Sequence, residues 1–189
     1  MITVYIKRIE NISENEKQNI INSLSDSAKE RLNKKRNEAQ RHTSLCALSL
    51  IPREMQQDLD YTENGRPFFK TLDADISISH SKKYAAVAIS TSKFESVGVD
   101  VEEINKTIHS NSLLRFFTEN ERVSVENGTP EIEIWTKKEA LFKYLKNDDI
   151  NFISLDSTQA VQSFTVEKLD GALLAVCADS KEEIEFIYK

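Results

Sequence analysis

The chain has 189 residues, of which 39% are hydrophobic and 30% are charged, enough apolar material for one domain or two small fused halves. No apolar run approaches the length needed to cross a bilayer, and the first residues lack the order of a secretory signal, so we expect a cytoplasmic protein without a membrane partner. The net charge of −6 is opposite in sign to that of chains that neutralise many phosphates, so we expect no nucleic-acid partner.

The first segments alternate between strand and helix patterns. Residues 2–7 alternate as a strand does. Ser13 and Glu16 have the spacing of a capping box that opens a helix. A second box, formed by Ser27 and Glu30, is expected to open the basic segment that follows.

The middle of the chain is predicted to pass from helix to sheet. Helical spacing runs from 38 to 51, and a turn is expected at 64–67 because of its Asn, Gly and Pro residues. Three β-like runs follow, at 76–80, 84–90 and 97–103. Their connections are short and polar, so the three runs are predicted to form a meander.

The second half again passes from helix to strands. Thr129 as a cap and Pro130 at the first helical position predict a helix that continues to about Lys146. Alternating patterns then predict further strands around 164–166, 173–178 and 183–188. Cys46 and Cys177 lie in apolar stretches and are expected to be buried small hydrophobes, not a disulfide or a metal pair.

Two carboxylates share one face of the strand predicted around residue 100. Because successive side chains of a strand point oppositely, Gly98, Asp100 and Glu102 lie on the face opposite the valines. Both acids can therefore converge on one cation, and Gly98 is expected to leave room for a ligand. The alternative is an ordinary solvated strand face.

A third carboxylate lies on the helix that begins near residue 130. Ile132, Trp135 and Phe142 follow helical spacing, and Glu139 falls in the same stripe, where a core residue is expected. A carboxylate in that position needs a partner, which a metal ion together with Lys143 would supply. The alternative is a surface ion pair between Glu139 and Lys143, four residues apart. Trp135 is expected to be a core anchor without a chemical role.

Three carboxylates without a His or Cys cluster define an oxygen-only site, which favours Mg²⁺ or Mn²⁺ over zinc. A magnesium ion held in this way usually completes its shell with water and substrate phosphate. The sequence therefore favours transfer of a phosphate-linked group, with Lys138 and Lys143 available to assist.

Five motifs follow one another along the chain, at residues 65–67, 78–81, 98–102, 116–121 and 135–143. Their order and spacing resemble those of the 4′-phosphopantetheinyl transferases of the Sfp type. The resemblance implies that Asp100, Glu102 and Glu139 hold Mg²⁺ against the pyrophosphate of coenzyme A, and that Lys143 stabilises the departing charge. Residues expected to contact coenzyme A or its phosphates are Arg36 or else Lys35, Arg41, Arg66, Ser79, His80 and Lys138. For His80, the alternative is a structural hydrogen bond at a strand end.

The resemblance also implies the fold. We expect an α+β protein of two similar halves, 1–95 and 96–189, each with helices packed on a small antiparallel sheet, related by a pseudo-twofold axis, with the cofactor in the cleft between them. We expect it to act as a monomer. Two departures from the family pattern stand out: Arg66 replaces a more usual lysine, and 144–149 contains no glycine, which leaves room for a longer helix.

The function implied is transfer of 4′-phosphopantetheine from coenzyme A to a serine of an acyl or peptidyl carrier protein, with release of 3′,5′-ADP. The base is Glu139 or a metal-bound water that it orients. Two alternatives from other classes are a non-catalytic coenzyme A or nucleotide-binding module and a small interaction protein whose charges are solvated. The sequence does not indicate which carrier is modified or whether acyl-coenzyme A is accepted.

Overall fold

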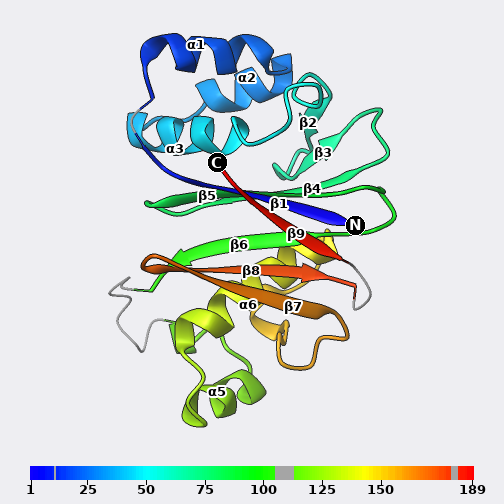
Figure 1. The fold of residues 1–189 in the computed structure, drawn as a ribbon. Coiled ribbons are helices and arrows are strands. Elements are labelled where there is room, and N and C mark those ends of the chain that lie inside the picture. Colours follow the sequence, from blue (N-terminus) through cyan, green and yellow to red (C-terminus); the bar gives the residue numbers. More distant parts are fainter. Residues whose placement is uncertain (11, 105–112, 180–182) are drawn as a thin grey trace.

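The computed structural model describes residues 1–10, 12–104, 113–179 and 183–189. Its elements form four layers. From top to bottom, Figure 1 shows three helices, a four-stranded sheet and a three-stranded sheet, and a long helix lies behind the second sheet. The expected α+β class is confirmed, while the pseudo-twofold axis and the division into halves stay predictions.

The first sheet has the strand order β4-β5-β1-β9. Its strands are β1 (Ile2–Arg8), β4 (Asp75–His80), β5 (Tyr84–Ser90) and β9 (Ile184–Tyr188). β5 pairs antiparallel with both β1 and β4, whereas β9 pairs parallel with β1. The end of the chain thus lies in the same sheet as its beginning.

The second sheet has the order β6-β8-β7 and is antiparallel throughout. Its strands are β6 (Gly98–Glu103), β7 (Ser163–Leu169) and β8 (Ala172–Ala178). The predicted strands are confirmed, but the predicted meander is wrong, because β6 leaves the sheet of β4 and β5 and pairs with β8. The apolar residues of β8 are buried on both faces, so this strand lies at the centre of its sheet.

Helices and a hairpin cover the outer face of the first sheet. They are α1 (Glu14–Ser23), α2 (Asp26–Asn33), α3 (Glu38–Leu48), β2 (Leu59–Tyr61) and β3 (Pro67–Phe69). The capping box of Ser13 and Glu16 is confirmed. The box at Ser27 is wrong: Ser25 caps α2, and its hydroxyl accepts the N–H of Ala28, so the helix begins two residues earlier than predicted.

The outer side of the second sheet carries α5 (Glu119–Glu126), α6 (Glu131–Leu145) and a short 3₁₀ helix, η1 (Phe152–Ser154). Thr129 does not cap α6, since Pro130 occupies the cap position and no side-chain hydrogen bond forms there. The helix ends at Leu145, and Lys146 takes the left-handed conformation with φ +50°. The longer helix that the absence of glycine from 144–149 left room for therefore does not form.

One apolar core lies between the two sheets. Alternate residues of β1, such as Val4, pack there against the valines of β6 and against Leu174 of β8. A second core fills the space between the first sheet and α1–α3, and a smaller one lies between α6 and the second sheet. Cys46 and Cys177 are buried and unbridged in these two outer cores, as predicted.

A row of side-chain hydrogen bonds joins the two sheets where β4 runs beside β6. Alternate residues of β4, Asp75, Ser77 and Ser79, accept these bonds through their side-chain oxygens. The donors are the backbone N–H groups of Val97, Val99 and Val101, at 2.9, 3.0 and 3.3 Å. We call this row the β4–β6 seam. It fixes the position of β6 relative to the first sheet without a backbone ladder.

Among the residues described, no helix is both long enough and apolar enough to span a membrane.

Candidate functional site

A cavity of about 320 Å³ opens where α2, α3 and the β2–β3 hairpin meet β4, β6 and α6. We call it the central cavity. It brings together residues from both sheets and from helices on opposite sides of the molecule. The predicted site residues that border it are Ser79, His80, Asp100, Glu102, Glu139 and Lys143.

The two acids of β6 point to the same side, as predicted. Val97, Val99 and Val101 are buried in the core between the sheets, so Asp100 and Glu102 face α6. Gly98 shares this face, but the prediction that it leaves room for a ligand is wrong.

The backbone of α6 fills the space beside Gly98. A β-carbon built there lies 2.0 Å from the carbonyl oxygen of Ala140 and 2.6 Å from the backbone nitrogen of Tyr144. Only a glycine permits this approach. Gly98 therefore sets the distance between β6 and α6, the two elements that carry the three acids.

Asp100 is 5% exposed, and its two carboxylate oxygens differ in their hydrogen bonds. Oδ1 accepts hydrogen bonds from Lys143 Nζ at 2.7 Å and from Ser79 Oγ at 2.8 Å. Oδ2 is buried and has no hydrogen-bond partner among the residues described. A buried carboxylate oxygen without a partner costs stability, which makes Oδ2 an open position for a cation or proton.

Lys143 uses all three of its N–H donors inside the protein. Besides Asp100 Oδ1, its ammonium donates to Ser79 Oγ at 3.1 Å and to the carbonyl of Val99 at 3.1 Å. A phosphate oxygen can reach this ammonium only in exchange for one of these three acceptors.

Glu102 is held by a residue expected to have only a packing role. Nε1 of Trp135 donates to Glu102 Oε1 at 3.3 Å. The indole ring is fixed by edge-to-face contacts with Phe116 and Phe152, whose ring centroids lie 5.7 and 5.5 Å away. Trp135 therefore orients one of the three acids, and the spacing of Glu102 and Trp135 on separate elements gives no sequence signal for this contact.

Glu139 borders the central cavity from α6. The stripe in which it lies is half-buried, and the fully buried side of α6 is formed instead by Ile134, Lys138 and Leu141. The expectation that Glu139 takes a core position is therefore wrong: its side chain is half-buried at the edge of the central cavity.

The donor set of the central cavity fits a hard cation. All three acids offer oxygen, and one oxygen of Asp100 is buried without a partner. In the described segments, however, no three His, Cys, Asp or Glu side chains already lie close enough together to hold a metal ion. The acids share the cavity without being gathered at one point.

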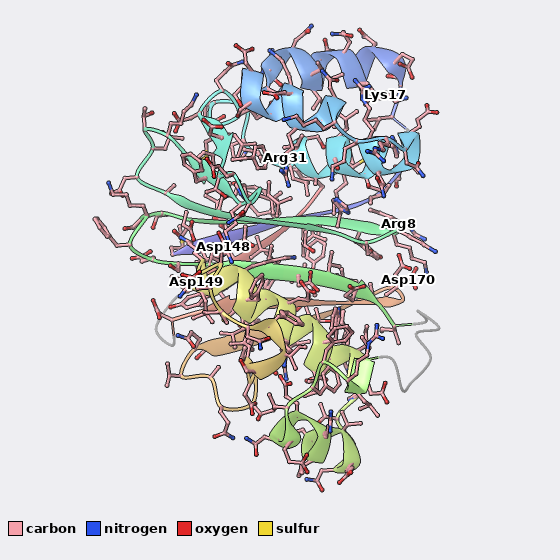
Figure 2. All side chains as sticks on the ribbon, turned by 180° about the vertical axis from the view of Figure 1, so that it is seen from behind. Arg8, Lys17, Arg31, Asp148, Asp149 and Asp170 are labelled. Atoms are coloured by element: carbon pink, nitrogen blue, oxygen red, sulfur yellow. The ribbon has the colours of Figure 1, made fainter. Side chains whose placement is uncertain are left out.

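The opposite side of the central cavity is basic. Arg31 and Lys35 border it from the α2 region, and Figure 2 labels Arg31 just above the first sheet. The guanidinium of Arg31 stacks on the ring of Tyr61, 4.7 Å from its centroid, and packs against Gly65, where a β-carbon would lie 2.4 Å from one of its nitrogens. The resemblance implied Lys35 as the alternative to Arg36 in the basic site, and Lys35 borders the central cavity. Arg31 was not expected to contact coenzyme A, although its spacing of four residues from Lys35 was a signal.

His80 lies at the end of β4 between the basic and acidic sides of the central cavity. Loss of solvation around its ring lowers the pKa of His80 from the ordinary value of 6.5, although part of the residue remains exposed. The positive charges of Lys35 and Lys143 lower this pKa further, while Asp100 opposes them. His80 is therefore biased towards the neutral form, and a bound anion would reverse that bias.

Three of the predicted contacts lie elsewhere. Arg36 and Arg41 border a separate pocket between α1 and α3, which Lys35 shares with the central cavity. Lys138 lies on the buried side of α6, where its ammonium is 2.7 Å from Glu121 Oε2. The structure thus does not bring Lys138 to the central cavity.

Arg66 joins the β2–β3 hairpin to the end of α6. Its guanidinium donates to the carbonyls of Lys143 and Phe142 at 3.2 and 3.4 Å, and its Nε lies 3.0 Å from Asp148 Oδ1. Figure 2 shows Asp148 just past the end of α6. Arg66 borders an adjoining pocket, which shares Glu139 and Lys143 with the central cavity.

The chain is similar in sequence to known proteins of one family. Residues 96–181 match the family model described as the 4′-phosphopantetheinyl transferase superfamily. The chain is 31% identical over 139 residues to the 4′-phosphopantetheinyl transferase AcpT of Salmonella typhimurium and 31% identical over 140 residues to AcpT of Salmonella typhi. Each alignment covers 69% of this chain and 69% of the relative.

Proposed function

Because the chain belongs to the 4′-phosphopantetheinyl transferase superfamily, we propose that it transfers the phosphopantetheine group of coenzyme A to a serine of an acyl or peptidyl carrier protein, with Mg²⁺ as its metal. We include in this proposal the assignment to the Sfp type, which is supported by the order of the five sequence motifs. The observation that carries the proposal is the central cavity, which has acids on one side and cations on the other.

The proposed reaction is a displacement at phosphorus. The serine oxygen of the carrier forms a bond to the β-phosphorus of coenzyme A, and the bond from that phosphorus to the oxygen of the leaving 3′,5′-ADP breaks. Glu139, directly or through a water that it orients, takes the serine proton. The products are phosphopantetheinyl-serine, 3′,5′-ADP and one proton, so atoms and charge balance.

In this proposal, Asp100, Glu102 and Glu139 hold Mg²⁺, which when bound neutralises charge on the pyrophosphate. The protein then has to hold the acids in place, and the contacts of Asp100 with Lys143 and of Glu102 with Trp135 do this. Lys143 is the proposed partner of the departing charge. To donate a hydrogen bond to the leaving phosphate, the ammonium of Lys143 has to give up one of its three acceptors within the protein.

The basic side is proposed to hold the remaining phosphate of coenzyme A. Arg31, Lys35 and His80 are the groups that border the central cavity there. Arg36 and Arg41 stay in the proposal as more distant positive charges, in the pocket that shares Lys35 with the central cavity. Arg66 stays in it as a residue of the adjoining pocket. Since residues of one chain, from Ala28 to Lys143, line the central cavity, we also propose that a monomer is sufficient, which analytical ultracentrifugation tests.

A mass measurement tests the proposal. Purified apo carrier protein, one of the acyl and one of the peptidyl class, is incubated with the protein, coenzyme A and Mg²⁺. We expect at least one carrier to gain the mass of one phosphopantetheine group, and the gain to disappear in Glu139→Gln and with chelator. Binding of coenzyme A without any mass gain on either carrier would instead favour the non-catalytic binding module.

A further inference from the structure

Ser79 lies at the point where the β4–β6 seam meets the acidic side of the central cavity. It is the last of the three seam residues of β4, is 7% exposed, and lies next to His80 in the sequence. The family resemblance implied a contact between its hydroxyl and a phosphate of coenzyme A. The hydrogen bonds of the hydroxyl indicate a different role.

The hydroxyl of Ser79 has no donor left for a phosphate, because its single proton is given to Asp100. A serine hydroxyl offers one donor and two acceptor positions. Ser79 Oγ donates to Asp100 Oδ1 at 2.8 Å and accepts from the N–H of Val101 at 3.3 Å and from Lys143 Nζ at 3.1 Å. All three positions are therefore used within the protein.

These three bonds determine how the carboxylate of Asp100 is presented. Ser79 and Lys143 both bind Oδ1, so this oxygen is occupied and the carboxylate cannot turn freely. The same arrangement leaves Oδ2 buried without a hydrogen-bond partner among the described residues. One oxygen is thus anchored by the protein, and the other is left to a cation.

We propose that Ser79 is a positioning residue, which acts on the metal through Asp100 and does not contact coenzyme A. This inference rests on the proposed function, since it assigns Asp100 to the metal. A positioning role and a direct phosphate contact differ in one measurable respect. If Ser79 positions Asp100, loss of its hydroxyl weakens coenzyme A binding in the presence of Mg²⁺ and leaves coenzyme A binding without Mg²⁺ unchanged. Groups that orient metal ligands typically contribute about tenfold to a hundredfold to metal affinity.

The chain offers a closely matched control in Ser77. Its hydroxyl accepts the N–H of Val99 at 3.0 Å, so it makes the same kind of seam bond on the same strand. Ser77 is similarly buried, at 4% exposed, and among the described residues the side-chain hydrogen bonds to Asp100 come from Ser79 and Lys143, not from Ser77. Replacement of Ser77 by alanine therefore removes a seam bond without removing an anchor of the carboxylate.

The test is calorimetric titration of coenzyme A into the full chain, once with Mg²⁺ and once with chelator. Mg²⁺ is expected to raise the affinity of the wild type for coenzyme A. For Ser79→Ala we expect this increase to be smaller by about tenfold or more, while the affinity for coenzyme A in chelator is unchanged. For Ser77→Ala we expect both affinities to match the wild type. Thermal unfolding of each variant establishes that it is folded, and Ser79→Cys, whose thiol is a weak donor and acceptor, replaces Ser79→Ala if alanine prevents folding.

Four results would overturn the inference: an equal loss of affinity with and without Mg²⁺ in folded Ser79→Ala, an undiminished gain from Mg²⁺ in that variant, an equal loss in Ser77→Ala, or no response of the wild type to Mg²⁺. The first result assigns Ser79 to a direct ligand contact, and the third assigns the effect to the seam as a whole. Failure of the proposed function is judged separately, by the absence of a mass gain on carrier protein with the wild type.

Discussion

The ammonium of Lys138 and the carboxylate of Glu121 form an ion pair at 2.7 Å in which neither side chain is exposed to solvent. The other oxygen of Glu121 accepts both the N–H and the hydroxyl of Ser157, and Lys138 also donates to the carbonyl of Leu155. The pair thus fastens the segment after η1 to α5 and α6. This is a structural role, which separates Lys138 from the proposed coenzyme A contacts.

Lys138→Met is therefore expected to lower the free energy of unfolding by about 3–5 kcal/mol, because it leaves Glu121 as a buried charge without its partner. Chemical denaturation measures this loss. Lys137→Met is the control: Lys137 forms a partly exposed i,i+4 pair with Glu133 at 2.6 Å, and its loss is expected to cost about 0.5 kcal/mol or less. Equal losses in the two variants would contradict a special role for the buried pair.

Gly98→Ala is expected to disturb stability and the proposed site together. Its new methyl group meets the backbone of α6 at Ala140 and Tyr144, so the helix has to move away from β6, at a cost of about 1–3 kcal/mol or more. Because α6 carries Glu139 and Lys143, we also expect transfer to carrier protein to fall.

Gly128→Ala separates the clash from backbone strain. Gly128 has φ +99° and no atom near a β-carbon built on it, so alanine there adds strain without a clash, about 1 kcal/mol. Denaturation and transfer rates of both variants provide the comparison. Activity that survives Gly98→Ala undiminished would show that the close approach of β6 and α6 does not set the site.

The left-handed conformation of Lys146 leads to a comparison of glycine with alanine. Nζ of Lys146 lies 2.6 Å from Asp75 Oδ1, so both Lys146→Gly and Lys146→Ala lose this ion pair. Only glycine relieves the backbone at φ +50°, and we expect Lys146→Gly to be more stable than Lys146→Ala by about 1 kcal/mol.

At an ordinary helical position the order is reversed. For Lys137, inside α6, glycine is expected to be less stable than alanine by about 1 kcal/mol. Denaturant titration of the four variants measures both differences. The same sign at both positions would mean that Lys146 is not strained.

The lowered pKa of His80 makes stability depend on pH. Because desolvation, Lys35 and Lys143 keep the folded-state pKa below 6.5, the unfolded chain takes up a proton first as the pH falls. This part of the free energy of unfolding therefore declines from around pH 6.5 down to the folded-state pKa, and is constant above and below that window.

Unfolding of the wild type and of His80→Gln at neutral and mildly acidic pH isolates this contribution, since the other titrating groups are common to both. We expect the wild type to lose more stability on acidification than the variant. Titration of the ring protons by NMR checks the cause directly, and added coenzyme A is expected to raise the pKa. A steeper loss in His80→Gln would contradict the assignment.

Much of the fold follows from local sequence patterns. Strand alternation, the capping box at Ser13 and the end of the long helix near Lys146 are all local, and the structure agrees with them. The pairing of β6 is not local. Asp75, Ser77 and Ser79 alternate with isoleucines, which is an ordinary strand pattern. Nothing in this pattern indicates that their side-chain oxygens accept hydrogen bonds from backbone N–H groups of another strand.

The site shows the same division. The shared face of Asp100 and Glu102 follows from strand geometry, and their meeting with Glu139 in one cavity required the tertiary fold. Arg31 and Trp135 acquire their contacts from distant elements, through Tyr61 and Glu102. The charge of Lys138 gives no hint of its burial, because its partner Glu121 lies on another helix.

The β4–β6 seam also bears on how the protein avoids self-association. β6 ends its own sheet, and the outermost strand of a sheet can recruit strands of other molecules through unpaired N–H and C=O groups, which leads to aggregation. Here the outward N–H groups of Val97, Val99 and Val101 are occupied by β4 side chains, and the carbonyl of Val99 by Lys143. The contacts that build the acidic side of the cavity thus also close this strand to other chains.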